Sequence, residues 1–340
     1  MCDTVLRMPQ ESFDERLIWL LQVSRNMLAT RDLDRLLALI TDAFIEASEA
    51  DRGFLLLRDR ETGKLVQRVA RTADGKNVTE SEARISTVAN RVAKEKKPVF
   101  ATDTAAQDDL AARRSIDELR LKMMVCVPLS IETETLGVIY ADGKTSLDKV
   151  FTNTNRRTLE MLADHAAAAI ENARMFERAT NDPLTGLPNN SYFILQLSKA
   201  MREASTDSAA GILLLDVDAF KRVNMAAGAE AGDRALVDIA STLQDVARAD
   251  GLVARYGSDK FAILLPPEQG TSIVVRLRDV AERARAAVAT KSYHGVQLSV
   301  SIGGVTYPGP AATSAPDLVA LADDQLARAR ARGPGEVEIG

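Results

Sequence analysis

Cysteine, histidine and aromatic residues are scarce in this chain of 340 residues. The two cysteines, Cys2 and Cys126, are too few for a disulfide framework, and the apolar run around Cys126 predicts a buried thiol. The two histidines, His165 and His294, are far apart in the sequence, which argues against a transition-metal site built from histidine. These scarcities argue against a disulfide-stapled protein and against a histidine-ligated metal centre.

Long apolar runs are also lacking: no stretch approaches the ~18 residues that span a bilayer. The first residues, which include Asp3 and Glu11, lack the apolar core of a signal peptide. The net charge of -5 argues against a nucleic-acid binder. With 46% apolar and 27% charged residues, the chain has the composition of a globular protein, and its length favours two domains. We therefore expect a cytoplasmic protein with neither a membrane nor a nucleic-acid partner.

The N-terminal half alternates between helical and strand patterns. An amphipathic helix is predicted over residues 12–30, and Asp32 is placed to cap a second helix. We expect the first helix to bury one face, formed by Phe13, Leu17, Leu20, Leu21, Ser24 and Leu28. Strands are predicted where short apolar runs are bounded by turn residues, at 52–58, 65–71, 123–129 and 136–142. These patterns predict an α+β domain with an antiparallel sheet.

A long helix is predicted from about Asn155 to Ala179, ending before Asp182-Pro183 because a residue that precedes proline resists the α-helical region. Its apolar residues recur at alternating spacings of three and four, at Leu159, Leu162, Ala166, Ala169, Ala173 and Phe176. This seam fits a parallel two-stranded coiled coil, and it fits equally well a helix that packs onto its own domain. Both alternatives stay open.

Two aspartates end strand patterns in the C-terminal half. The apolar run 211–215 is typical of a central strand and ends in Asp216-Val217-Asp218. Asp259 lies in a predicted hairpin turn between runs 252–256 and 261–265. If the hairpin lies beside the first strand, the carboxylates of Asp216 and Asp259 converge, as a site for a divalent cation and phosphate requires. The alternative is that both aspartates only end strands and turns.

Several ordered motifs surround these aspartates. They are Asp182-Pro183-Leu184-Thr185-Gly186-Leu187-Pro188-Asn189, Leu215-Asp216-Val217-Asp218-Ala219-Phe220-Lys221-Arg222-Val223-Asn224, Gly232-Asp233, Arg255-Tyr256-Gly257-Ser258-Asp259-Lys260-Phe261, Ser299-Val300-Ser301-Ile302-Gly303-Gly304 and Ala322-Asp323. In this order the region 180–340 resembles the GGDEF family of diguanylate cyclases. The resemblance implies a mixed sheet wrapped by helices, related to nucleotidyl cyclases and polymerase palms. It also implies synthesis of cyclic di-GMP and two diphosphates from two GTP in a dimer.

The region of about 30–175 is similar to the GAF family of sensory domains. The similarity rests on Asp51-Arg52-Gly53-Phe54-Leu55-Leu56-Leu57, Val127-Pro128-Leu129, Leu136-Gly137-Val138-Ile139-Tyr140 and Ala166-Ala167-Ala168-Ala169-Ile170-Glu171-Asn172-Ala173. It specifies no ligand. We expect an α+β chain of an N-terminal helix (1–30), a GAF-like domain (31–155), a connecting helix (156–180) and a degenerate GGDEF domain (181–340). A homodimer is expected through the helices around 12–30 and 156–180.

The GGDEF resemblance assigns roles to individual residues. It implies Mg2+ with GTP, held by the carboxylates of Asp216 and Asp259 and the carbonyl of Val217. For the nucleotide it implies the amide of Phe220 against phosphate, Asn224 and Asp233 at the guanine, Gly257 of the signature, and Arg330 near phosphate. The product-inhibition motif of the family is degenerate here, at Arg248 and Asp250, because the acid is displaced by one residue.

Four departures from the family pattern concern chemistry. Lys260 replaces the second acid of the signature, and a lysine neither ligates Mg2+ nor, when protonated, acts as a base. We expect its ammonium to pair with Asp216, with Asp259 or with a phosphate. Ser258 replaces a glycine, Ala327 a tyrosine and Pro334 a phosphate-binding arginine. The first interpretation is therefore a GAF sensor joined to a non-catalytic GGDEF domain that binds GTP or a protein partner. An active diguanylate cyclase and a nucleotide-free dimerisation scaffold are the alternatives.

Overall fold

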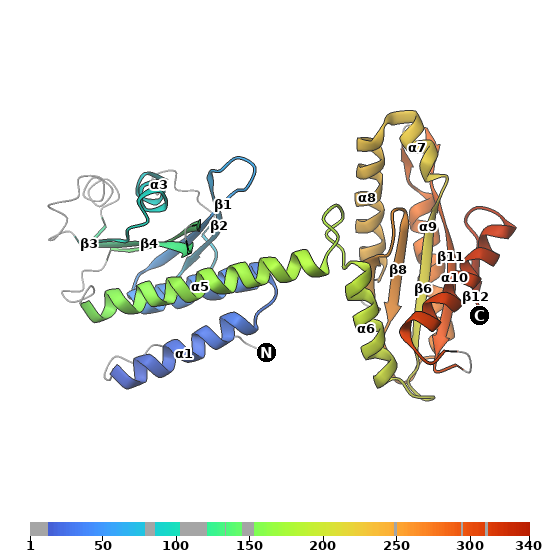
Figure 1. The fold of residues 1–340 in the computed structure, drawn as a ribbon, viewed down its shortest axis with the longest axis horizontal. Coiled ribbons are helices and arrows are strands. Elements are labelled where there is room, and N and C mark those ends of the chain that lie inside the picture. Colours follow the sequence, from blue (N-terminus) through green and yellow to red (C-terminus); the bar gives the residue numbers. More distant parts are fainter. Residues whose placement is uncertain are drawn as a thin grey trace. The chain divides into compact units, whose positions relative to one another are not determined.

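The computed structural model describes residues 13–78, 86–102, 121–132, 134–144, 153–247, 250–293, 295–309 and 312–340. The chain divides into two compact units, residues 1–177 and 178–340. Among the described residues, none of the helices combines the length and the apolar character that crossing a bilayer would take. Figure 1 shows the helices and strands of each unit.

The N-terminal unit is built on an antiparallel sheet in the order β2-β1-β5-β4-β3. Its strands are β1 (Arg52–Arg58), β2 (Leu65–Thr72), β3 (Val99–Thr102), β4 (Met123–Ile131) and β5 (Glu134–Gly143). Its helices are α1 (Phe13–Ala29), α2 (Leu33–Ser48), α3 (Ser86–Glu95) and α5 (Asn153–Thr180), which continues into the second unit. The Asp32 side chain accepts from the Arg35 amide and caps α2, as predicted. The antiparallel α+β domain that the sequence predicted is confirmed.

Each face of this sheet has its own core, because successive strand residues point to opposite faces. Leu55 and Val125 lie on the face covered by α1, α2 and α5. Phe54 and Cys126 lie on the other face with α3, and Cys126 is fully buried, which confirms the predicted thiol environment. Burial raises the pKa of the Cys126 thiol far above its ordinary value.

The helical seam predicted for a coiled coil is buried inside its own unit. The residues from Leu159 to Ala173 in this seam are at most 3% exposed and belong to the core beneath α1 and α2. The guanidinium of Arg31 lies 4.6 Å from the centroid of the Phe176 ring. The coiled-coil interpretation of this seam is therefore wrong, and the seam packs onto its own domain.

The buried face of α1 also differs from the prediction. Leu17, Leu21 and Leu28 are 41%, 58% and 55% exposed. Leu20 and Ser24 of the predicted face are buried, and they pack against the domain together with Trp19, Val23 and Met27. The helix is apolar on two sides, and tertiary packing selected the side that carries tryptophan. Its Ser24 Oγ lies 2.5 Å from Nδ1 of His165 on α5, so the two helices contact each other through this polar pair.

The C-terminal unit contains a mixed sheet in the order β12-β11-β6-β8-β7, in which only the β11–β12 pair is parallel. Its strands are β6 (Ala210–Asp218), β7 (Leu252–Arg255), β8 (Lys260–Leu265), β11 (Ser299–Tyr307) and β12 (Val337–Ile339). A separate pair is formed by β9 (Ser292–Tyr293) and β10 (Val296–Gln297). The mixed sheet and the hairpin at 256–259 agree with the sequence prediction.

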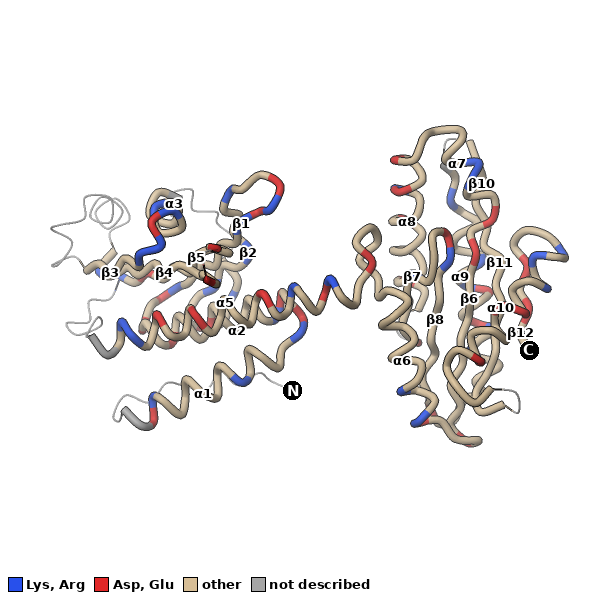
Figure 2. The backbone as a smooth tube through the Cα atoms, viewed as in Figure 1, with Lys and Arg blue, Asp and Glu red and all other residues tan. Residues whose placement is uncertain are grey.

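Helices cover both faces of this sheet. They are α6 (Asn190–Glu203), α7 (Phe220–Ala227), α8 (Ala229–Ala247), α9 (Ile273–Ala289) and α10 (Ala315–Arg332). The core with α8 and α9 takes Leu213 and Leu215 from β6, whereas the core with α6 and α10 takes Ile212 and Leu214. Even-numbered residues of β6 therefore face α10. Figure 2 shows acidic and basic residues interspersed along both units.

Close approach of α10 depends on Gly303 of β11. A Cβ built there would lie 2.1 Å from the backbone nitrogen of Leu326 and 2.4 Å from the carbonyl oxygen of Ala322. Only glycine fits a position where helix backbone meets strand backbone. This contact brings the charged residues of α10 over the carboxyl end of β6.

Candidate functional site

The site is built around a cross-strand pair at the end of the central strand. Asp216 on β6 lies directly opposite Lys260 on β8. Opposed residues of an antiparallel pair share a face, and this face is the one that α10 covers. The predicted meeting of the hairpin with the end of the 211–215 strand is therefore observed, and Lys260 is the hairpin residue in register with Asp216.

Asp216 is held by an arginine of α10. Its side chain is 7% exposed, and Nη1 of Arg330 donates to its Oδ2 at 3.0 Å. Burial raises the pKa of Asp216, Arg330 opposes this effect, and the neighbouring Asp259 adds to it. The carboxylate is thus a desolvated group whose charge depends on a cation from α10.

Lys260 pairs with another residue of α10. Its Nζ lies 3.1 Å from Oδ1 of Asp323. The expectation that Lys260 pairs with Asp216 or Asp259 is wrong, because Arg330 already occupies Asp216 and α10 brings Asp323 within reach. Asp323 and Arg330 stand seven residues apart, about two helical turns, and so lie along one side of α10. The four side chains form two ion pairs, which lie side by side because Asp216 and Lys260 are cross-strand neighbours, and we call this set the ion-pair network.

Asp259 lies in the turn that precedes Lys260. Its Oδ1 accepts from Oγ of Ser258 at 2.9 Å, and its carbonyl accepts from the amide of Val217 at 3.0 Å. Ser258 has no positive φ, so the Cβ that replaces a glycine hydrogen causes no backbone strain here. The backbone bond to Val217 fixes the turn against the end of β6.

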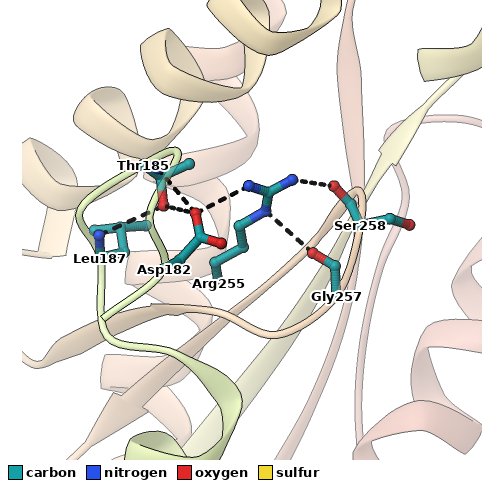
Figure 3. Close-up of polar contacts among 6 residues, drawn as sticks. All are labelled: Asp182, Thr185, Leu187, Arg255, Gly257 and Ser258. Atoms are coloured by element: carbon teal, nitrogen blue, oxygen red, sulfur yellow. Dashed lines mark hydrogen bonds and ion pairs between the residues drawn. The ribbon is translucent and has the colours of Figure 1, made fainter. Parts of the chain in front are cut away.

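Arg255 joins this turn to the loop that follows α5 (Figure 3). Its Nη1 donates to Oδ1 of Asp182 at 2.9 Å, and its Nε and Nη2 donate to the carbonyls of Gly257 at 3.2 Å and Ser258 at 2.8 Å. Burial raises the pKa of Asp182, but the bonds from Arg255 and Thr185 outweigh it and hold that pKa below its ordinary value. Both residues were within the quoted motifs, but nothing in the sequence indicated that they meet.

Asp218, two residues beyond Asp216, connects three segments of the C-terminal unit through hydrogen bonds. Its carboxylate accepts from Oγ of Ser299 at 2.6 Å, Oγ of Ser301 at 2.8 Å and the amide of Gly335 at 2.8 Å. These bonds connect β6, β11 and the segment that follows α10. A carboxylate with this set of donors holds the end of α10, and thereby Arg330, near β6.

The carboxylates of the site do not fit a Mg2+ ion. That ion requires about six oxygen ligands in a near-octahedral arrangement and favours negative charge. Here Asp216 accepts from a guanidinium, Asp259 accepts from a hydroxyl, and Lys260 stands in the register position beside them. Within the described parts of the chain, no three His, Cys, Asp or Glu side chains come together as a metal site. The donor set is that of an ion-pair network.

The residues expected at the nucleotide lie around α7 and the start of α8. Helix α7 begins at Phe220 after Ala219, which has a left-handed φ of 58° and gives no side-chain cap. A Cβ on Gly232 would lie 1.9 Å from Oδ1 of Asn224 and 3.2 Å from the Phe220 ring, so glycine is required for Asn224 to pack there. Asp233 follows Gly232 on α8. Phe220 and Asn224 therefore meet at the start of α8, whereas Arg330 belongs to the ion-pair network with Asp216.

The degenerate product-inhibition motif is only partly described. Arg248 lies outside the described residues. Asp250 is bound by α9: its Oδ2 accepts from Nη2 of Arg283 at 2.5 Å, and its carbonyl accepts from Arg276 at 3.3 Å. Nη1 of Arg283 also donates to the carbonyl of Val246, near the end of α8. Asp250 is thus part of the α8–α9 contact.

Known protein families match both units. Residues 30–171 match the GAF domain, and residues 179–336 match the family described as "Diguanylate cyclase, GGDEF domain". The chain contains a GAF domain followed by a GGDEF domain, which confirms the architecture that the sequence motifs suggested.

Two relatives of this chain are named diguanylate cyclases. Diguanylate cyclase A of Treponema denticola is 29% identical over 220 residues, which are 63% of this chain and 58% of that protein. Diguanylate cyclase TpbB of Pseudomonas aeruginosa is 37% identical over 147 residues, 43% of this chain and 34% of that protein. The chain therefore spans less than two thirds of the length of these relatives. The crystal structure of the coiled coil and GGDEF domain of DgcB from Caulobacter crescentus with c-di-GMP matches 56% of this chain and 100% of its own, at 25% identity and a TM-score of 0.49.

Proposed function

We propose that the GGDEF domain of this protein binds GTP without converting it to cyclic di-GMP, and that the GAF domain acts as its sensory partner. One observation carries the proposal: Lys260 stands opposite Asp216 and is paired with Asp323. Lys260, a base, thus stands at the position where the family pattern has an acid, and its ion pair with Asp323 connects it to α10.

Loss of turnover follows from the chemistry of this position. A protonated lysine cannot accept the proton of a ribose hydroxyl, and it does not ligate the metal that stabilises charge in phosphoryl transfer. Arg330 is bound to Oδ2 of Asp216 and competes with a metal ion for that carboxylate. Ala327 supplies no hydroxyl, and Pro334 no guanidinium, where the family pattern has these groups. Losing an acid in such a site costs orders of magnitude in rate.

GTP binding is supported by the residues that the family pattern leaves unchanged. Asn224, Asp233 and Gly257 are present, and Asn224 is positioned by Gly232 and Phe220. A carboxylate such as that of Asp233 can accept two hydrogen bonds from guanine, whereas adenine presents a single donor on that edge. The amides that open α7 at Phe220 provide donors for phosphate. We therefore expect GTP to bind in preference to ATP.

The test measures binding and turnover on the same full-length protein. GTP at about 100 times its Kd should stabilise the domain by about 2.7 kcal/mol, and ATP at the same concentration by much less. Incubation with GTP and Mg2+, read by mass spectrometry, should give no cyclic di-GMP. Asp233→Ala should abolish the preference for GTP. An unchanged melting temperature with GTP would refute the proposal and favour a nucleotide-free scaffold.

An active diguanylate cyclase is the second candidate, because Asp216 and Asp259 are retained and the named relatives are diguanylate cyclases. It predicts cyclic di-GMP from the wild-type protein. If the wild type is inactive, a Lys260→Glu variant that makes product would show that Lys260 causes the inactivity. A variant that is also inactive would show that Ser258, Ala327 and Pro334 contribute to it.

We further propose that the protein is a homodimer through the helices around 12–30 and 156–180. The support is a set of solvent-exposed apolar side chains on α1 and α5, namely Leu17, Ile18, Leu21, Leu28, Met161 and Met175. The Ser24–His165 contact places these two helices against each other. A second copy that presents the same helices would cover the surface in a four-helix arrangement.

A further inference from the structure

The ion-pair network offers two cations where the family pattern provides for metal. We infer that GTP binds this site without a divalent cation, with Lys260 and Arg330 contacting its phosphates directly. This inference rests on the proposed GTP binding. It adds that the ligand is the metal-free nucleoside triphosphate.

The charge of the site carries the first part of the argument. The formal charges of the two ion pairs cancel, and the carboxylates of Asp259 and Asp218 add negative charge near Asp216. A Mg2+ ion placed beside Asp216 would meet the guanidinium of Arg330 and the ammonium of Lys260 at close range, and like charges in a partly buried site repel strongly. A triphosphate meets attraction at the same positions. Mg2+ bound to GTP removes two of its negative charges and so weakens this attraction.

Arg330 is the fixed cation of the two. Its partner Asp216 is only 7% exposed, and breaking a pair that leaves a buried carboxylate alone is strongly unfavourable. The arginine itself is 54% exposed, so its guanidinium has donors that face solvent while one donor holds Asp216. Arg330 can therefore contact a phosphate without leaving Asp216.

Lys260 is the exchangeable cation. Its partner Asp323 is 56% exposed and Lys260 itself is 33% exposed, and ion pairs of this kind contribute little to stability. The ammonium is a point charge on a flexible stem, so it can turn from Asp323 to a phosphate at small cost. Asp323 thus competes with the ligand for Lys260.

The experiment is calorimetric titration of the full-length protein with GTP, once with EDTA and once with excess Mg2+. We expect binding in EDTA that is at least as tight as in Mg2+. Lys260→Ala should weaken binding in EDTA by roughly tenfold, because a charged contact to phosphate is lost. Asp323→Asn should strengthen it by roughly threefold, because the competitor for Lys260 is removed. The strengthening is a result that a purely structural role of Asp323 does not give.

The matched control is Lys199→Ala, which removes an exposed lysine of α6 that pairs with Glu203. This variant should bind GTP as the wild type does. Lys260→Glu should bind GTP only when Mg2+ is present, since it replaces the cation with a metal ligand.

The outcomes separate this inference from the proposed function. Binding that requires Mg2+ in the wild type would overturn the metal-free site and leave GTP binding intact. The absence of binding in both buffers would overturn both. Equal weakening by Lys260→Ala and Lys199→Ala would show that only overall charge matters, and this would also overturn the inference.

Discussion

Replacing Arg255 by methionine should loosen two turns at once. The substitution keeps the apolar stem but removes the donors to Asp182, Gly257 and Ser258. Arg255 and Asp182 are 13% and 19% exposed, so the pair is largely shielded from water. Bonds to charged groups are worth about 1.5–3 kcal/mol each and do not add fully, so we expect a local loss of about 3 kcal/mol.

Amide hydrogen exchange of the full-length protein measures this loss. The amide of Asp182 donates to the carbonyl of Leu187, and the amide of Tyr256 donates to that of Lys260, so each reports opening of its own turn. Both should exchange roughly 100-fold faster in the variant. The control Arg234→Met removes an exposed arginine that pairs with Glu230 on α8 and should leave both amides unchanged.

The pH dependence of the stability difference between wild type and Arg255→Met can refute this reasoning. Because the folded protein holds the pKa of Asp182 below its ordinary 3.8, this group stabilises the fold above that pH, and the stabilisation disappears as pH falls through the folded pKa. The difference between wild type and Arg255→Met should therefore shrink below about pH 4. A difference that is constant down to low pH would refute the role of the Asp182 charge, and unchanged exchange at neutral pH would refute the clamp itself.

Three further substitutions test other parts of the account. Asp218→Asn removes the charge that accepts from two serines and the Gly335 amide, and should lower stability by about 1–3 kcal/mol in chemical denaturation; no change would mean these bonds are not stabilising. Gly303→Ala should cost more than about 3 kcal/mol because its Cβ meets the backbone of α10, and a soluble variant with wild-type melting would contradict the close packing. Leu21→Glu, at an exposed position on α1, should convert the dimer to a monomer in light scattering, whereas a dimer of unchanged stability would exclude this surface.

Local patterns predicted most of the elements. The hairpin followed from the turn residues at 257–259 between two apolar runs, and the strands of the first unit followed from short apolar runs bounded by turn residues. The cap of α2 by Asp32 also depends only on neighbours in the sequence. Such features are determined within a few residues, which is why a sequence reveals them.

Features that depend on packing between segments far apart in the chain could not be predicted from the sequence. Helix α1 is apolar on two sides, and its periodicity could not tell that Trp19 rather than Leu21 faces the core. The partner of Lys260 lies 63 residues further along the chain and is reached only because α10 packs closely on β11. The pair of Arg255 and Asp182 spans 73 residues in the same way. The residue types were enough to locate the site, but which charged side chains form ion pairs depends on the fold.

Equilibrium dialysis of the full-length protein against GTP with Mg2+, followed by mass spectrometry of the nucleotide in the protein chamber, tests the central claim most directly. We predict that intact GTP accumulates with the protein and that no cyclic di-GMP forms. Accumulation of cyclic di-GMP would show that the site with Lys260 is catalytic. Equal GTP on both sides of the membrane would show that the domain does not bind this nucleotide.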